Sequence, residues 1–263
     1  MADLFHYGSA AKALDADDRY GSDGDMKKTQ YVMQLLGFPG DVDTLKCLLT
    51  AAEKGIEVES GVLDMTKGEQ DSDDFRAISP FGITPALKEA QYVVVGEPGC
   101  AVFIEGRGLG NRLAPRNAAV LATEMEWMEV GKTEVQPHVE ALMMQKVCGK
   151  MADPSFVTDD AAVQAARAAL ADPLDAFDDQ LQSNEFVVGQ YSYADIHWTI
   201  YVHLLTVMGE GALYAKHNNI KAWFERVKAH KSFSGQDIIS YDFLPTLEEI
   251  QAKVMKDVEC GEF

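Results

Sequence analysis

The uneven distribution of strand signals constrains the fold of this chain more than any other feature. Between residues 30 and 108, short apolar or alternating runs are separated by helical patterns and by Gly and Pro turns. Beyond about Leu113 the strand signals nearly vanish, and long stretches rich in Ala, Glu, Met and Leu follow. The sequence therefore predicts an α+β protein, with an N-terminal α/β domain followed by an all-α helical-bundle domain.

Local signals place the elements of the α/β domain. A helical pattern opens at Asp43 and closes at Gly55, a residue type that readily adopts the left-handed conformation found after a helix. The predicted order is β-α-β-α-β-β-α, in which the last two strands form a hairpin. Strands are expected over residues 31–36, 56–63, 86–88 and 92–95, with further helices over 71–78 and after Glu97.

Four segments divide the chain. Residues 1–29 are rich in Gly, Ala, Asp and Ser, and we expect them to form an N-terminal extension. Residues 30–108 form the α/β domain and residues 113–240 the helical domain. Residues 241–263 are expected to form a C-terminal helix and tail.

Helical patterns dominate the second half of the chain. Pro137 and Pro173 interrupt the first two patterns, and Ser192 with Asp195 has the spacing of a capping box at the start of the third. The patterns cover residues 117–147, 159–182, 192–208 and 220–228.

Charge and composition narrow the classes of partner. The chain has 23 Lys and Arg against 42 Asp and Glu, a net charge of −19, which disfavours nucleic acids and anionic membranes. No run approaches the roughly 20 apolar residues of a membrane span, and no basic stretch with an apolar core marks a secretory signal. We therefore expect a cytoplasmic protein whose four cysteines are reduced. Neither the cysteines nor the histidines have metal-ligand spacing, so no metal site is expected.

Four motifs in order resemble those of the glutathione transferase family. Ile78–Leu87 resembles the N-P-x-G-x-V-P-x-L pattern before the third strand, and Gly189–Ile196 resembles G-x-x-x-S-x-A-D-I. Leu113–Trp127 and Ala222–Lys228 are similar to the family's L-x-P…W and A-W-x-x-R-V segments. The resemblance implies that the α/β domain is thioredoxin-like and binds glutathione, that the helical domain follows it, and that the protein is a homodimer.

The resemblance also assigns a binding role to Thr84 and Pro85. An X-Pro bond directly before a strand is a candidate cis peptide where a backbone edge must face a ligand. In the family the equivalent proline is cis, and the residue before it pairs its backbone with the cysteinyl part of glutathione. The alternative is an ordinary turn proline without a ligand.

Thr44 is the candidate catalytic residue. It stands where similar enzymes place a Ser, or in other classes a nearby Cys, at the start of the first helix. Since the thiolate is the nucleophile, the resemblance implies that the Thr44 hydroxyl and the helix N-terminus stabilise it. Alternatively, Thr44 only caps the helix. Asp41 and Asp43 beside it would oppose a thiolate electrostatically.

Glu97 occupies the acidic position of the family's E-S pair, which binds the γ-glutamyl end of glutathione. Pro98 follows it in place of Ser and removes both a hydroxyl and an N–H donor. Proline is nevertheless favoured in the first turn of a helix. We therefore expect weaker glutathione binding or a changed ligand, and the alternative is that Glu97 is a simple helix-start acid.

Two functions follow from this pattern. The first is a glutathione-dependent transferase that uses glutathione as co-substrate and joins its thiolate to a small apolar electrophile. The alternative is a non-catalytic, glutathione-transferase-like scaffold or binding protein. Pro98, the acids around Thr44 and the N-terminal extension favour this alternative.

Overall fold

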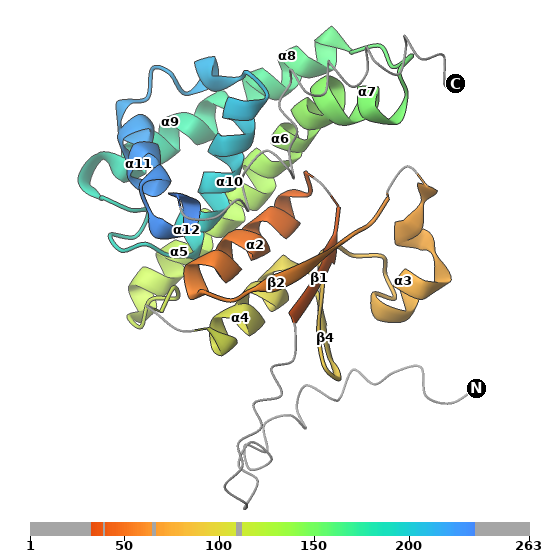
Figure 1. The fold of residues 1–263 in the computed structure, drawn as a ribbon. Helices are drawn as coiled ribbons and strands as arrows, with labels where there is room; N and C mark the ends of the chain where they lie inside the picture. The colour runs from red at the N-terminus through yellow and green to blue at the C-terminus, as the bar shows by residue number, and fades with distance from the viewer. Residues whose placement is uncertain (1–32, 39, 65–66, 109–111, 235–263) are drawn as a thin grey trace, which may run out of the picture.

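The computed structural model describes residues 33–38, 40–64, 67–108 and 112–234. Within them, a mixed sheet with flanking helices is followed by a region built of helices, so the predicted fold class is confirmed (Figure 1). The extension predicted over residues 1–29 and the helix and tail predicted over 241–263 lie outside the described residues. The domain limits themselves stay predictions.

The sheet has four strands in the order β2-β1-β3-β4. The central strand β1 (Met33–Gly37) runs parallel to β2 (Val58–Val62) and antiparallel to β3 (Ala86–Glu89). A hairpin joins β3 to β4 (Tyr92–Val95). The element order therefore matches the predicted one, and the central strands contribute buried side chains to the core of the α/β domain.

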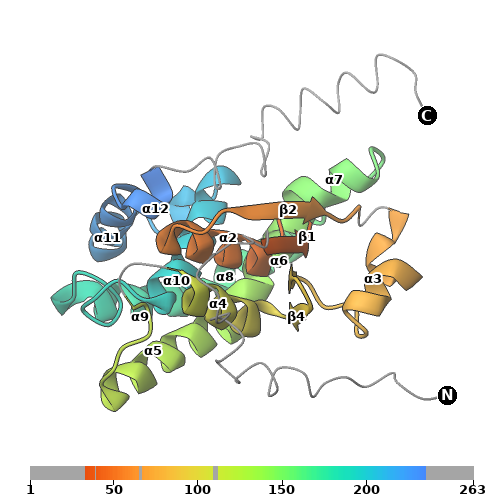
Figure 2. The same ribbon diagram turned by 60° about the horizontal axis from the view of Figure 1, so that its bottom comes forward.

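Helices cover both sides of this sheet. On one side α2 (Val42–Lys54) packs against α4 (Glu97–Arg107), and both lie toward the helical domain (Figures 1 and 2). On the other side lies α3 (Asp73–Ile78), which follows the short 3₁₀ helix η3 (Glu69–Asp71). As predicted, α2 ends at Gly55, which has a φ of 65°.

The two domains share α2 as a common layer. Its side chains Val42, Leu45 and Leu49 belong to the core of the helical domain. Cys47 and Leu48 belong to the core beneath the sheet. Because both sides of α2 are covered, all of its residues except Asp43 are buried.

The helical domain begins with a long interrupted helix. The segments α5 (Ala118–Val130), α6 (Gln136–Met143) and α7 (Gly149–Ala152) are joined by two π-helical turns, η4 (Gly131–Val135) and η5 (Met144–Cys148). Pro137 lies in the first turn of α6, after the first π turn. The remaining elements are α8 (Asp160–Ala169), α9 (Ala171–Gln180), η6 (Leu181–Ser183), α10 (Tyr193–Val207), η7 (Gly211–Leu213), α11 (Asn218–Lys228) and α12 (Lys231–Ser234).

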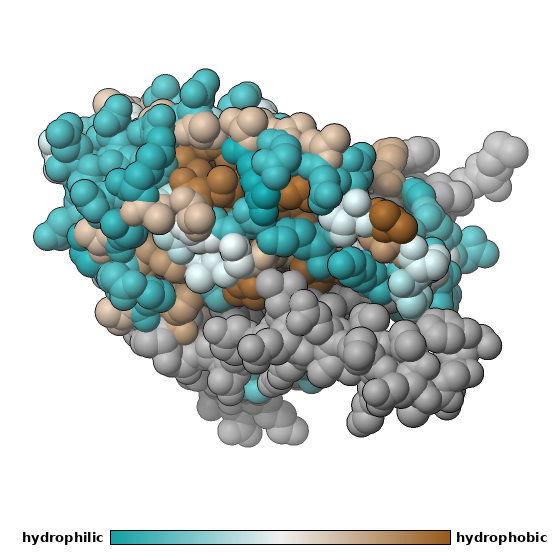
Figure 3. Space-filling view, turned by 90° about the horizontal axis from the view of Figure 1, so that it is seen from above, coloured by the Kyte–Doolittle hydropathy of each residue, from teal (hydrophilic) through white to brown (hydrophobic). Residues whose placement is uncertain are grey.

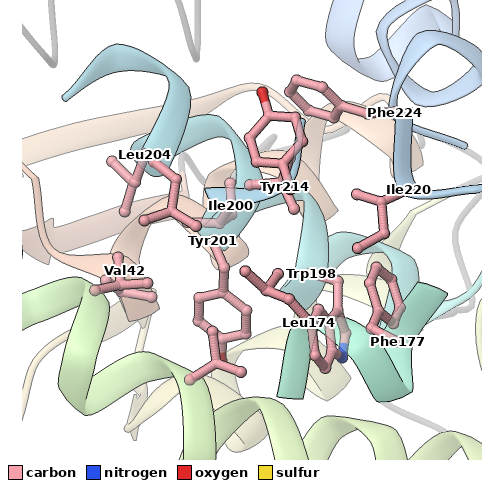
Figure 4. Packing of buried hydrophobic residues seen from close by; sticks show 14 of the residues in the cluster. Val42, Leu174, Phe177, Trp198, Ile200, Tyr201, Leu204, Tyr214, Ile220 and Phe224 are labelled. Atoms are coloured by element: carbon pink, nitrogen blue, oxygen red, sulfur yellow. The ribbon is translucent and has the colours of Figure 1, made fainter. Parts of the chain in front are cut away.

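The core of the helical domain surrounds α10. Phe177 stacks on Trp198 with ring centroids 3.7 Å apart, and Figure 4 shows Val42 of α2 in the same cluster as Tyr201 and Leu204 of α10. The predicted capping box at the start of α10 is confirmed.

The face of the molecule seen in Figure 3 is mainly hydrophilic, with small hydrophobic patches between the polar residues. This agrees with the high content of acidic residues in the chain. Among the described helices, none has the length and apolar character needed to cross a membrane.

Candidate functional site

A cis peptide bond marks the predicted glutathione-binding region. The bond between Thr84 and Pro85 is cis, as expected from the sequence, and lies directly before β3. The carbonyl oxygen of Pro85 accepts a hydrogen bond from the Gly96 amide at 2.8 Å. The Cys100 thiol donates to the same oxygen at 3.7 Å. The cis-proline loop is therefore held against the start of α4.

Asp41 joins this loop to α2. It is the N-cap residue of α2, and its Oδ1 accepts a hydrogen bond from the Asp43 amide at 3.4 Å. Its other carboxylate oxygen accepts from the Thr44 hydroxyl, and the Thr84 side chain lies close enough to this carboxylate to lower its pKa. Asp41 is only 8% exposed, and burial raises its pKa to about 6 because the loss of water outweighs the hydroxyl donors.

Thr44, the predicted catalytic residue, lies in the first turn of α2 and is 5% exposed. Its hydroxyl donates to Asp41. Gly37 at the end of β1 makes room for it, since a Cβ there would overlap the Thr44 side chain. The structure therefore fixes the position of this hydroxyl by a hydrogen bond on one side and by tight packing on the other.

The neighbouring acid, Asp43, forms an ion pair with Lys46. Lys46 Nζ is fully buried and lies 2.9 Å from Asp43 Oδ1. The same ammonium donates to Gln136 Oε1 at 2.8 Å and lies 4.9 Å from the centroid of the Tyr201 ring. Lys46 thus balances the charge of Asp43 and links α2 to two elements of the helical domain.

Glu97 contacts a different partner. It is 2% exposed, and its Oε1 lies 3.0 Å from Nε2 of His197 in α10. Burial lowers the pKa of His197, although Glu97 acts in the opposite direction. Pro98 lies in the first turn of α4, as predicted. The predicted contact of Glu97 with the γ-glutamyl end of glutathione stays a prediction.

The structure brings three of the four predicted site residues together. Thr44 and Thr84 lie beside Asp41, and Pro85 follows Thr84 through the cis bond, whereas the carboxylate of Glu97 is bonded to His197. Asp41 appeared in the sequence only as an acid that opposes a thiolate. Its position as the helix N-cap, directly after Gly40 of the sequence Gly37-Phe-Pro-Gly40, was the signal for a closer role.

The comparisons with known families agree with this architecture. Residues 31–96 match the model of the glutathione S-transferase N-terminal domain, and residues 132–231 match that of the glutathione S-transferase C-terminal domain. Together these matches span more than half of the chain. This chain belongs to the glutathione transferase family.

Individual relatives are distant. Glutathione S-transferase F10 of Arabidopsis thaliana is 26% identical over 192 residues, which are 72% of this chain and 88% of the relative. Glutathione transferase F7 of Populus trichocarpa has a TM-score of 0.70 and 23% identity over 78% of this chain and 97% of its own. The structure of glutathione S-transferase I bound with lactoylglutathione has a TM-score of 0.71 and 18% identity, with coverage of 78% and 97%. These likenesses establish the thioredoxin-like and helical domains.

Proposed function

We propose that this glutathione transferase family member joins the thiolate of glutathione to a small apolar electrophile. The observation that carries the proposal is the arrangement at the start of α2, where a cis-proline loop meets the N-terminus of a 13-residue helix. A helix N-terminus offers unpaired amides and a favourable dipole to an anion such as a thiolate.

Each predicted residue has a role in this proposal. The backbone of Thr84, held by the cis bond to Pro85, pairs with the cysteinyl part of glutathione. The hydroxyl of Thr44 stabilises the sulfur. Glu97 meets the γ-glutamyl amine and keeps His197 as a second partner. The bound lactoylglutathione of the structural relative supports a glutathione-type ligand in this fold.

Conjugation of glutathione to an aryl halide tests this function, with wild type compared with Thr44→Ala. We expect turnover in the wild type and a marked loss in the variant. A wild type that neither turns over nor binds millimolar glutathione would contradict the proposed function. Full turnover in Thr44→Ala would contradict only the role of Thr44.

We also propose that the protein is a cytoplasmic homodimer. Large apolar side chains are exposed on the α/β domain at Phe81, Val93 and Val102, and burial in a dimer would remove them from water. Sedimentation of Phe81→Asp should show a monomer, whereas Val157→Asp, at an exposed site in the helical domain, should sediment as the wild type does. Cell fractionation tests the location.

A second candidate function is a non-catalytic scaffold or binding protein of the same fold. The pairing of Glu97 with His197, together with Pro98 in the first turn of α4, favours it because both reduce the groups available to glutathione. Calorimetry with glutathione separates the two functions. Saturable binding supports the transferase, and a folded protein that binds no glutathione supports the scaffold.

A further inference from the structure

We propose that Asp41 accepts the proton of the glutathione thiol, so that its carboxylate and the sulfur share one proton and one negative charge. This inference rests on the proposed function, because it requires glutathione to be held at Thr84. It assigns a proton-transfer role to a residue that the family resemblance does not single out.

Asp41 lies between the two elements that are expected to hold the sulfur. Its carboxylate receives a hydrogen bond from the hydroxyl of Thr44, and it lies close enough to the side chain of Thr84 for that side chain to lower its pKa. Thr44 and Thr84 are the two residues expected to flank the sulfur. A sulfur placed between the start of α2 and the cis-proline loop therefore lies beside this carboxylate.

The charges around the Asp41 carboxylate are unbalanced. The groups that face Asp41 are Asp43 and Thr44 from α2 and Thr84 from the loop before β3. Lys46 balances Asp43, whereas Asp41 forms no ion pair within the described part of the chain. An ionised Asp41 beside a thiolate would thus place two negative charges together without a cation, and one shared proton removes that repulsion.

The affinity of the carboxylate for protons supports the same role. Burial raises the pKa of Asp41 to about 6. This value is closer to the pKa of a free thiol, about 8.5, than the pKa of an exposed carboxylate is. Proton transfer is most effective when the base has a pKa near the working pH.

The proton moves from the sulfur to Asp41 before the new bond to carbon forms. A carboxylate oxygen of Asp41 forms an O–H bond as the S–H bond breaks, and the electron pair stays on sulfur. The thiolate attacks the electrophile, and with an aryl halide the leaving group departs as halide. Asp41 then returns the proton to water.

Protonation of Asp41 also changes its contact with Thr44. In the structure the hydroxyl of Thr44 donates to the carboxylate. Once Asp41 carries a proton it is a weaker acceptor, and the hydroxyl is released to donate to the thiolate. The acid and the predicted catalytic hydroxyl therefore act in sequence.

Asp41→Asn tests this role with little change in shape, because asparagine is as good an N-cap as aspartate. The matched control is Asp43→Asn, which removes the same charge from the same helix end. In the wild type, kcat/KM for an aryl halide should rise with a midpoint near the Asp41 pKa of about 6 and then level off. In Asp41→Asn it should fall by on the order of tenfold or more at pH 7. Its midpoint should move toward the thiol value of about 8.5.

The control should move the midpoint slightly downward, because the charge of Asp43 helps to raise the pKa of Asp41, and it should not move the midpoint toward the thiol value. Calorimetry with glutathione and thermal unfolding should show that Asp41→Asn still binds and folds. An unchanged pH profile, or a gain of activity, in a variant that binds glutathione would overturn the role of Asp41 and leave the proposed function standing. Absence of glutathione binding by the wild type would instead overturn the proposed function and this step with it.

Discussion

Glu97 of α4 and His197 of α10 form a buried pair across the domain boundary, with Oε1 and Nε2 3.0 Å apart. Both side chains are 2% exposed, so their mutual hydrogen bond replaces hydrogen bonds to water. Glu97, which is predicted to bind glutathione, thus also forms a hydrogen bond between the two domains.

Replacement of one member of this pair should be costly. His197→Ala leaves the Glu97 carboxylate buried without this partner, and we expect the free energy of unfolding to fall by about 3 kcal/mol. Denaturant titration measures this. The double variant Glu97→Gln with His197→Ala should lose less than the sum of the single variants, and strict additivity would show that the two side chains are not coupled.

Glutathione affinity tests the second role of Glu97. If its carboxylate meets the γ-glutamyl amine, Glu97→Gln should weaken glutathione binding by on the order of tenfold, the worth of one charged hydrogen bond. Calorimetry at constant pH measures the affinity. The matched control is Glu105→Gln, in the same helix and bonded to Tyr193. An equal loss in both variants would point to a general effect on α4.

Gly37→Ala should disturb the predicted catalytic hydroxyl. The new Cβ overlaps the side chain of Thr44, and we expect a loss of about 1–3 kcal/mol in stability together with reduced turnover. Urea unfolding measures the first effect. The stability loss should shrink in the Thr44→Ala background, where two of the three overlapping atoms are absent. The same loss in both backgrounds would mean that Thr44 is not the obstacle.

Acid should destabilise the fold through His203. Burial lowers the pKa of this side chain to about 4, whereas in the unfolded chain it takes a proton at its ordinary pKa of about 6.5. Between pH 7 and pH 4.5 the unfolded state therefore binds more protons, and about 2–3 kcal/mol of stability is lost. His203→Leu should remove this contribution to the pH dependence of the free energy of unfolding, whereas His138→Leu in α6 should retain it. Identical slopes for His203→Leu and the wild type would contradict this.

The capping box of α10 should contribute more to the free energy of unfolding than the exposed N-cap of α8. Asp195 is buried and accepts hydrogen bonds from Val187, Ser192 and Trp223. We expect Asp195→Ala to cost about 4 kcal/mol, since several buried donors lose their acceptor. Asp159→Ala at the exposed start of α8 should cost about 1 kcal/mol. Thermal unfolding of the two variants measures these losses. Equal losses of stability would contradict the prediction that a buried cap contributes more than an exposed one.

Features set by local signals were predictable from the sequence. The end of α2 follows from Gly55, and its start was expected at Asp43, one residue after the observed start at Val42. The capping box follows from Ser192 and Asp195. The cis bond at Pro85 was expected because the surrounding motif resembles that of a known family.

Features that join distant parts of the chain were not predictable in this way. Glu97 and His197 are 100 residues apart in sequence, and nothing local in either segment indicates the pairing. Lys46 is fully buried and bonded to Asp43 and Gln136 at the domain boundary, and Gln136 lies 90 residues further along the chain. The pKa of Asp41 likewise depends on burial that only the assembled fold creates.

The shared position of α2 has a consequence for how the protein tolerates change. Opposite sides of this one helix belong to the cores of both domains, and α10 and α12 pack against it. A substitution in α10 therefore reaches the start of α2 through direct contact, without passing through the sheet. A change in either core that displaces α2 would therefore also displace Asp41 and Thr44 at its start.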